Sequence, residues 1–203
     1  LAIGDYDQAI TLDPKDAQTY ENRAIAKGAK ENFKEALDDY SKAIELNPAE
    51  PETFNLRGVT KYKLEDHDGA IADYTRAIEL DGSNPVYFDN RALSKTEKGD
   101  HSGAIEDYSA SIELYPSDPE TYYQRALVKL GMNNKYDACL DFKRAEDLGS
   151  IDRAVQRRPF RNEGHSVVPV PRGQLRFREL DQSILDRRRR RRVGNEMDTA
   201  EIA

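Results

Sequence analysis

The sequence contains little of what secreted, membrane and metal-binding proteins depend on. Its 203 residues include one cysteine, three histidines and no tryptophan. Cys139 therefore has no partner for a disulfide within the chain, which fits a reducing compartment. No apolar run approaches the roughly 18 residues that a membrane-spanning helix needs, and residues 1–10 lack the basic start and apolar core of a signal peptide. We therefore expect a cytoplasmic protein that does not span a membrane.

Recognisable catalytic motifs are also missing. The sequence has no glycine-rich phosphate loop, no helix with paired metal-binding histidines and a glutamate, and no Ser/His/Asp set. Its acidic residues are numerous, but they recur at fixed intervals as solvated helix faces do, and they do not form an isolated acid–base pair. We therefore expect a protein that is not an enzyme and that has no catalytic residue, metal ligand or cofactor.

Charge is distributed unevenly along the chain. Residues 1–150 contain 18 basic and 30 acidic residues, a net charge of −12, whereas residues 151–203 contain 13 arginines, no lysine and 8 acidic residues, a net charge of +5. The C-terminal part also contains a run of six arginines, Arg187–Arg192. Such a run of like charges is solvated and poorly ordered in isolation. Residues 151–203 are thus predicted to be a basic tail of low order.

The acidic part is built from a repeat of 34 residues. Large aromatic residues recur at this interval, at Tyr6, Tyr40, Tyr74, Tyr108 and Phe142. Small residues recur in two further registers, at Ala2, Ala36, Ala70, Ala104 and Ala138, and at Ala9, Ala43, Ala77, Ser111 and Ala145. Each unit contains two apolar patterns with a period near 3.6, which predicts two helices joined by a turn. The alanines allow the helix axes to approach closely, and the aromatic rings fill the remaining space.

This pattern resembles the tetratricopeptide repeat family, whose 34-residue unit carries aromatic residues, alanines and a proline at set spacings. The resemblance covers Leu1 to about Ser150, and it implies an all-α fold, a right-handed solenoid of helical hairpins. Gly82 and Ser150 stand where the family usually has proline. Turns within the hairpins are predicted near Lys30–Glu31, Glu65–Asp66, Gly99 and Asn133–Asn134.

The repeat also predicts the division of the chain into units. Residues 1–16 correspond to the second helix of a truncated leading repeat, so the chain can be a fragment at this end. Glu146 replaces the isoleucine of the earlier units, as the outward face of a terminal repeat requires. Four complete repeats are expected between the two ends, followed by the basic tail, at residues 17–50, 51–84, 85–118, 119–150 and 151–203.

Arginine and aspartate also follow the repeat. They recur at Arg23, Arg57, Arg91 and Arg125, and at Asp5, Asp39, Asp73, Asp107 and Asp141. Each aspartate precedes the next arginine by 18 residues, and the antiparallel course of successive helices brings the two level. We therefore predict ion pairs between successive repeats, Arg57 with Asp39, Arg91 with Asp73 and Arg125 with Asp107. The alternative is a row of solvent-facing arginines that binds phosphate or carboxylate.

The positions of two histidines and the cysteine in the 34-residue repeat predict structural roles for them. His67 and His101 occupy equivalent sites at the start of successive second helices. Hairpins stacked roughly 10 Å apart hold such residues too far apart for one metal ion, whose bonds to nitrogen are about 2 Å long. Cys139 matches the apolar residues Leu37, Ile71 and Ile105, which predicts a small core residue rather than a nucleophile.

The resemblance also implies where a ligand would bind. In the family the first helices line a concave face, and fixed positions of each unit point inward. Candidate peptide-binding residues are Gln18, Glu21, Asn22, Ile25, Asn55, Val59, Tyr62, Asp89, Asn90, Leu93, Tyr123, Gln124 and Leu127. Asparagine and glutamine can both donate to and accept from a peptide backbone, and the inward carboxylates, which include Glu52 and Glu120, favour a basic segment. Family members that hold the acidic C-terminal tail of a chaperone use lysine and arginine here, so that ligand is not expected.

Two functions from different classes follow. The first is a scaffold for protein–protein interaction that binds a protein or an extended, preferably basic, peptide in this groove. The alternative is a nucleic-acid-associated protein anchored by Arg187–Arg192 through salt-sensitive phosphate contacts. Only Phe160 and Phe177 accompany the arginines of the tail, which offers little aromatic surface for base stacking.

Overall fold

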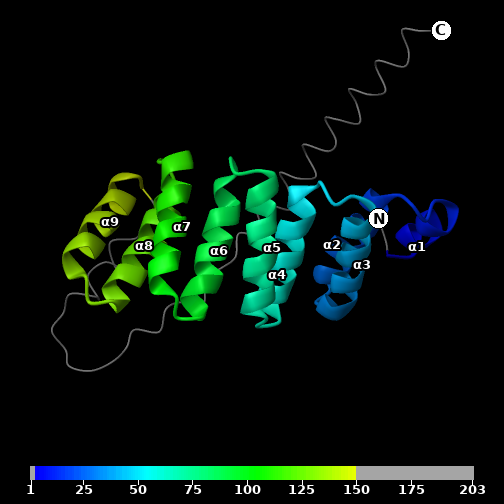
Figure 1. Ribbon diagram of the computed structural model, residues 1–203, viewed down its shortest axis with the longest axis horizontal. Coiled ribbons are helices and arrows are strands. Elements are labelled where there is room, and N and C mark those ends of the chain that lie inside the picture. The colour runs from blue at the N-terminus through cyan, green and yellow to red at the C-terminus, as the bar shows by residue number, and fades with distance from the viewer. Residues whose placement is uncertain (1–2, 150–203) are drawn as a thin grey trace, which may run out of the picture. The chain divides into compact units, whose positions relative to one another are not determined.

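The computed structural model describes residues 3–149, and this range is helical without a β-strand. From the second helix onward, consecutive helices form four antiparallel pairs that are stacked in chain order (Figure 1). The predicted all-α solenoid is therefore confirmed for this part of the chain. Its helices are α1 (Ile3–Leu12), α2 (Ala17–Gly28), α3 (Phe33–Leu46), α4 (Pro51–Lys63), α5 (His67–Leu80), α6 (Pro85–Glu97), α7 (His101–Leu114), α8 (Pro119–Gly131) and α9 (Lys135–Asp147).

Local sequence determines where the helices begin. Three of the first helices of the pairs start with proline, whose fixed φ and missing N–H suit the first helical position. Asp16, Asn84 and Asp118 cap first helices by accepting a hydrogen bond from the backbone N–H two residues later. Asp66 and Asp100 cap second helices in the same way, three residues before the N–H that they bind. None of the described helices is long and apolar enough to cross a membrane.

A residue in the left-handed conformation reverses the chain inside each hairpin. These residues are Glu31, Glu65, Gly99 and Asn133, with φ values of 63°, 64°, 80° and 61°. All four lie at the predicted turn positions. A left-handed residue at this point ends a helix because it directs the chain away from the helix axis.

The repeated small and aromatic residues form the core between the helices. Tyr40, Tyr74, Tyr108 and Phe142 are buried, as are the alanines of both registers from Ala36 to Ala145. A close contact lies between α4 and α5, where the Tyr74 ring packs on Gly58. A Cβ atom at Gly58 would lie 2.8 Å from Cε1 of Tyr74. Glycine is thus required for the close approach of these two helices.

Cys139 is exposed, so the prediction that it is a core residue is wrong. Its equivalents Leu37, Ile71 and Ile105 are half-buried, and Ile105 packs against a core cluster that includes Val128 of the following hairpin. Cys139 lies on α9, the last helix of the described range, where no further hairpin packs against it. The position in the stack, and not the residue type, decides its burial.

Replacing Gly58 with alanine is expected to destabilise the stack. The added methyl group would overlap the Tyr74 ring, and overpacking of this kind costs about 1–3 kcal/mol. Gly28→Ala at the end of α2 is the matched control, because nothing lies within 4 Å of its would-be Cβ. The measurement is urea unfolding followed by circular dichroism, and equal unfolding free energies for the two variants would contradict the packing argument.

Candidate functional site

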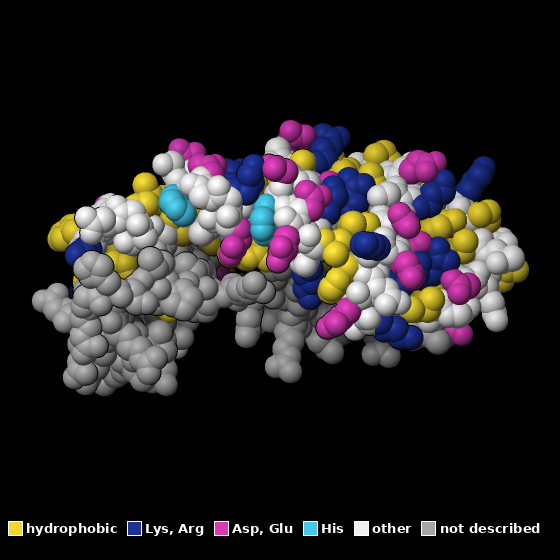
Figure 2. Space-filling view, turned by 90° about the horizontal axis from the view of Figure 1, so that it is seen from below, with side chains coloured by type: hydrophobic (Ala, Val, Ile, Leu, Met, Phe, Trp, Pro, Cys, Tyr) yellow, Lys and Arg dark blue, Asp and Glu magenta, His cyan; other side chains and the backbone are white. Residues whose placement is uncertain are grey.

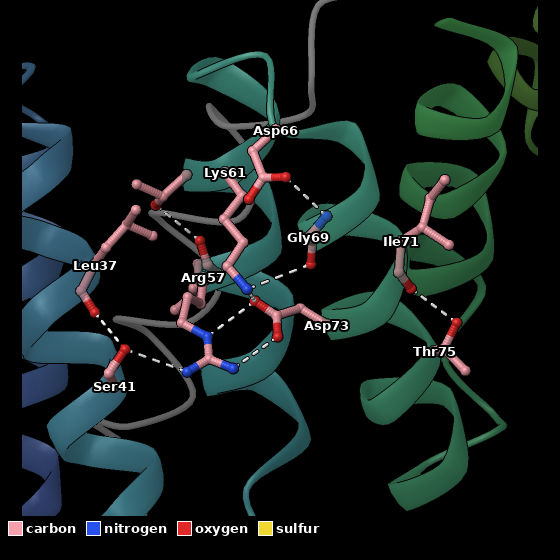
Figure 3. Close-up of polar contacts among 11 residues, drawn as sticks. Leu37, Ser41, Arg57, Lys61, Asp66, Gly69, Ile71, Asp73 and Thr75 are labelled. Carbon is pink, nitrogen blue, oxygen red and sulfur yellow. Dashed lines mark hydrogen bonds and ion pairs between the residues drawn. The ribbon is translucent and has the colours of Figure 1, made fainter. Parts of the chain in front are cut away.

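The most regular polar feature is a cluster of one arginine, one aspartate and one lysine in each hairpin. In α4 and α5, Arg57 donates from Nε and Nη2 to the two carboxylate oxygens of Asp73, at 2.9 and 2.7 Å. Lys61 Nζ lies 2.8 Å from Asp73 Oδ2 (Figure 3). Asp73 is only 4% exposed. The same arrangement recurs as Arg23–Asp39–Lys27, Arg91–Asp107–Lys95 and Arg125–Asp141–Lys129.

This pairing corrects the ion pairs predicted from the sequence. Arg57 binds the aspartate of its own hairpin, 16 residues later, and not Asp39 of the preceding one. Arg57 and Asp73 are equally distant in sequence from the turn residue Glu65, so the antiparallel helices of one hairpin bring them level. Arg91 and Arg125 likewise bind the aspartate 16 residues later.

The arginines also reach the preceding hairpin, through a different acceptor. Arg57 Nη1 donates to Ser41 Oγ at 3.2 Å, two residues beyond the predicted Asp39. Equivalent bonds join Arg91 to Thr75 at 3.1 Å, Arg125 to Ser109 at 2.9 Å and Arg23 to Asp7 at 2.7 Å. The arginine of each unit therefore connects its own hairpin to the helix before it.

The arginines are structural rather than a row of free cations. The guanidinium group of Arg57 lies 5.7 Å from the centre of the Phe54 ring, and the three other cluster arginines lie over Tyr20, Phe88 and Tyr122. Hydrogen bonding to Asp39 raises the pKa of Arg23 above its ordinary value, against the effect of its own burial. On the face shown in Figure 2, basic side chains are interspersed with acidic and apolar ones. A continuous arginine surface for phosphate is not found there.

The predicted peptide-binding residues come from the first helices α2, α4, α6 and α8, but they differ in accessibility. Gln18 is exposed, and seven others are half-buried: Asn22, Ile25, Tyr62, Asp89, Tyr123, Gln124 and Leu127. The other five are buried between helices: Glu21, Asn55, Val59, Asn90 and Leu93. The first eight residues are therefore at least partly accessible to solvent, while the other five are not.

Polar contacts join successive first helices along this face. Asn90 Nδ2 donates to Asn55 Oδ1 at 2.9 Å, which brings two of the predicted residues together. Thr121 Oγ1 donates to Asp89 Oδ1 at 3.1 Å, and the hydroxyl of Thr53 donates to the carboxylate of Glu21. These contacts hold neighbouring first helices in register and satisfy the side chains that they bury.

The sequence reasoning missed the hydroxyl residues that make these contacts. Besides Thr53 and Thr121, Tyr87 donates from its hydroxyl to Glu52 Oε2 at 3.1 Å. All three occupy the third position of a 34-residue unit, and Thr19 holds the same position in the first complete unit. A hydroxyl at a fixed position in every unit is a signal that the repeat itself contains.

Carboxylates of the first helices act on two buried tyrosine hydroxyls. Burial raises the pKa of the Tyr87 hydroxyl above its ordinary value, and the charge of Glu52 raises it further. Burial likewise raises the pKa of Tyr108, and Asp89 and Glu120 both add to the shift. Asp89 on α6 and Glu120 on α8 thus both raise the pKa of the same hydroxyl.

Two further predicted features can be located. His67 and His101 begin α5 and α7 and are half-buried, and within residues 3–149 no group of three or more His, Cys, Asp or Glu side chains could hold a metal ion. The arginine run Arg187–Arg192 lies outside the described residues, so nucleic-acid binding through it stays a prediction.

The comparison with protein families matches most of the helical stack. Models described as tetratricopeptide repeats match residues 17–49, 51–84 and 92–133. Together these ranges cover more than half of the 203 residues. No curated protein matches the chain.

Solved structures with the same fold include MamA, at a TM-score of 0.70 and 22% identity over 72% of this chain and 85% of that one. YrrB, described as a TPR protein with an unusual peptide-binding site, has a TM-score of 0.65 and 24% identity, over 72% of this chain and 76% of its own. The first TPR of Spaghetti (RPAP3), bound to the HSP90 peptide SRMEEVD, has a TM-score of 0.56 and 20% identity, over 58% and 93%. At these identities the likeness shows the fold.

Removing one cluster arginine is expected to weaken the stack. Arg57→Ala should lower the free energy of unfolding by about 2–4 kcal/mol, because buried Asp73 loses two charge-assisted hydrogen bonds. Arg76→Ala is the control, because the side chains of its pair with Glu79 are 50% and 56% exposed and such pairs contribute about 0–1 kcal/mol. Urea unfolding measures both, and a loss for Arg57→Ala no larger than that for the control would contradict the assigned role.

The buried tyrosines predict a limit on stability at alkaline pH. Burial raises the pKa values of Tyr74, Tyr87 and Tyr108, whereas an unfolded tyrosine ionises near pH 10. Their contribution to stability is therefore complete below about pH 10 and is lost as the pH rises towards the folded-state pKa. Tyrosinate absorbance and circular dichroism, followed together, should show part of the 11 tyrosines ionising only as the helices unfold. Ionisation of all of them with the helices intact would contradict this prediction.

Proposed function

Because the chain belongs to the tetratricopeptide repeat family, we propose that it is a scaffold for protein–protein interaction, and not an enzyme, that binds an extended segment of another protein along the inward face of α2, α4, α6 and α8. The observation that carries this proposal is that different polar residues lie in different places. The arginines are bound inside the hairpins, while amide, carboxylate and aromatic side chains remain accessible on the first helices. Peptide binding by YrrB and by the first TPR of Spaghetti supports the proposal.

The accessible residues suit an extended backbone flanked by side chains. Gln18 Nε2 donates to Asn22 Oδ1 at 3.2 Å, and Gln124 Nε2 donates to Glu120 Oε1 at 2.6 Å. The amide oxygens of Gln18 and Gln124 can accept from a peptide N–H. Ile25 and Leu127 offer half-buried apolar surface for small aliphatic side chains. Such a surface holds a peptide without demanding one sequence, so affinity depends on the charged residues around it.

The charges favour a basic segment. Glu52, Asp89 and Glu120 lie on successive first helices. Burial is the main cause of the raised pKa values of Tyr87 and Tyr108, and the charge of Glu52 adds to the first while the charges of Asp89 and Glu120 add to the second. Burial and then the charge of Glu120 also raise the pKa of Tyr123, a half-buried residue one turn further along α8. A lysine or arginine bound here would meet a carboxylate together with an aromatic ring, both of which attract cations. An acidic segment such as SRMEEVD would be repelled.

The proposal predicts that binding depends on charge at the inward face. A fluorescently labelled peptide of alternating lysine and alanine should bind the full chain more tightly than the same peptide with glutamate in place of lysine, as measured by fluorescence anisotropy. Glu120→Gln should weaken the binding of the lysine peptide about three- to tenfold at low salt, which corresponds to roughly 1 kcal/mol for one charge contact.

The matched control for this experiment is Glu79→Gln. Glu79 is an exposed glutamate on the second helix α5, away from the first helices. Removing it changes the net charge by the same amount, so any effect of overall charge appears in both variants. Equal affinity of the wild-type chain for the two peptides, or an equal loss for the two variants, would overturn the assignment of the basic ligand to this face.

A further inference from the structure

The outward face of α9 carries apolar residues that the fold does not require. Tyr136 and Leu140 are one helical turn apart, and they are 76% and 51% exposed. Met132 is 46% exposed as well, but it lies at the C-terminal end of α8, before the turn that leads into α9. On the opposite side of α9, Ala138, Asp141, Phe142 and Ala145 are buried against the rest of the hairpin. The helix therefore packs by one face and presents a second apolar stripe to solvent.

The earlier second helices have no such stripe. The positions equivalent to Tyr136 are Lys34, Asp68 and Ser102, and those equivalent to Leu140 are Asp38, Ala72 and Glu106. All six residues are exposed, although a further hairpin follows each of their helices. The next hairpin in such a stack therefore does not cover these positions. Tyr136 and Leu140 therefore occupy positions that are exposed in each of the second helices α3, α5, α7 and α9. Cys139 differs, because its equivalents in the earlier helices are half-buried.

The residues on the two sides of Leu140 form a self-complementary pattern. With 3.6 residues per turn, Asp137 and Arg144 lie on one side of Leu140, and Tyr136 and Lys143 lie on the other. On each side, one residue lies about one turn before Leu140 and the other about one turn after it. If a second α9 packs antiparallel with its Leu140 opposite the first, Asp137 faces Arg144 of the second copy. Tyr136 then faces Lys143 of the second copy, a favourable pairing of cation and ring.

We propose that this face of α9 binds a second copy of the chain, as an antiparallel helix pair around a two-fold axis at Leu140. A two-fold contact uses the same surface on both copies, so it requires a surface whose charges complement themselves when the direction is reversed. A partner of uniform charge would be repelled at either Asp137 or Arg144. One helix pair is a small interface, below the size of stable dimers, so the dimer is weak and forms at a protein concentration on the order of 100 µM.

The first test is the concentration dependence of the mass of the full chain in sedimentation equilibrium. The wild-type chain should approach the mass of a dimer as its concentration rises. The double variant Tyr136→Ser with Leu140→Glu should remain a monomer at the same concentrations. These substitutions introduce the residues that α7 carries at equivalent positions, Ser102 and Glu106, so they are compatible with the fold. A wild-type chain that stays monomeric, or a double variant that still dimerises, would overturn the proposal.

A matched control separates this face from apolar exposure in general. Leu114 is 42% exposed at the end of α7, away from the stripe. Leu114→Glu should leave the dimerisation constant within about twofold. A loss as large as that of the double variant would mean that association depends on general hydrophobicity, which would contradict a defined two-fold contact.

The charge pattern provides a test that only the proposed register passes. Asp137→Arg and Arg144→Asp, prepared as separate chains, should each dimerise at least threefold more weakly because like charges then face each other. Mixing the two chains should restore association, because opposite charges then meet at both ends of the mixed helix pair. Asn134 donates to Asp137 at the start of α9, so circular dichroism must show intact helices. If Asp137→Arg loses helicity, Arg144→Asp alone must still weaken dimerisation, and failure to do so would overturn the register.

Cys139 supplies an independent readout, because it is the single cysteine of the chain and is exposed. It is next to Leu140 in sequence, so the two sulfur atoms of the proposed dimer are separated by a distance on the order of the helix spacing, about 10 Å. A short bis-maleimide should therefore join two wild-type chains but not two chains of the double variant. Peptide binding at the inward face should be the same for both, which keeps this test separate from that of the proposed function. Equal cross-linking of the two chains would overturn the proposal.

Discussion

The arginine–aspartate–lysine cluster is the interaction on which the rest of the stack depends. In each hairpin a nearly buried carboxylate accepts two hydrogen bonds from one guanidinium group and lies within 2.8 Å of an ammonium group. Burying such charges costs free energy unless each charge has its partner. The cluster therefore favours the one relative placement of the two helices in which all three side chains meet. The third nitrogen of each arginine, Nη1, then donates a hydrogen bond to a side chain of the preceding helix. A single side chain thereby sets both the geometry within a repeat and the geometry between repeats.

The inward face follows from that arrangement. The clusters orient the first helices so that hydroxyl, amide and carboxylate groups of successive helices meet, as Asn90 and Asn55 do. These contacts engage Glu21, Asn55 and Asn90, three predicted binding residues that are buried between the helices. The accessible part of the face contains carboxylates, tyrosines and half-buried aliphatic residues. Such a surface is suited to a segment that is recognised by its charge more than by its shape.

The stack also separates its surfaces by helix type. First helices carry the proposed ligand-binding residues, and second helices carry charged residues that face away from them. On α9 alone among the described second helices, apolar residues occupy two of those outward positions. A contact between copies at this face would leave the inward faces of both copies accessible. Two such faces in one assembly would raise the effective affinity for a partner that carries two binding segments.

The sequence by itself determined the hairpins, their turns and the residues of their core, because a 34-residue period repeats each local signal several times and the alanine and aromatic positions agree with it. The sequence did not decide which aspartate forms the ion pair with Arg57. Asp39 and Asp73 are each level with this arginine, one across the loop at Pro48 and the other across the turn at Glu65. Only the close packing of α4 on α5, allowed by Gly58, places Asp73 within hydrogen-bond distance. The tertiary structure likewise decided the exposure of Cys139 and the burial of Asn55, because burial depends on which hairpin lies alongside, a property of the stack that no single repeat contains.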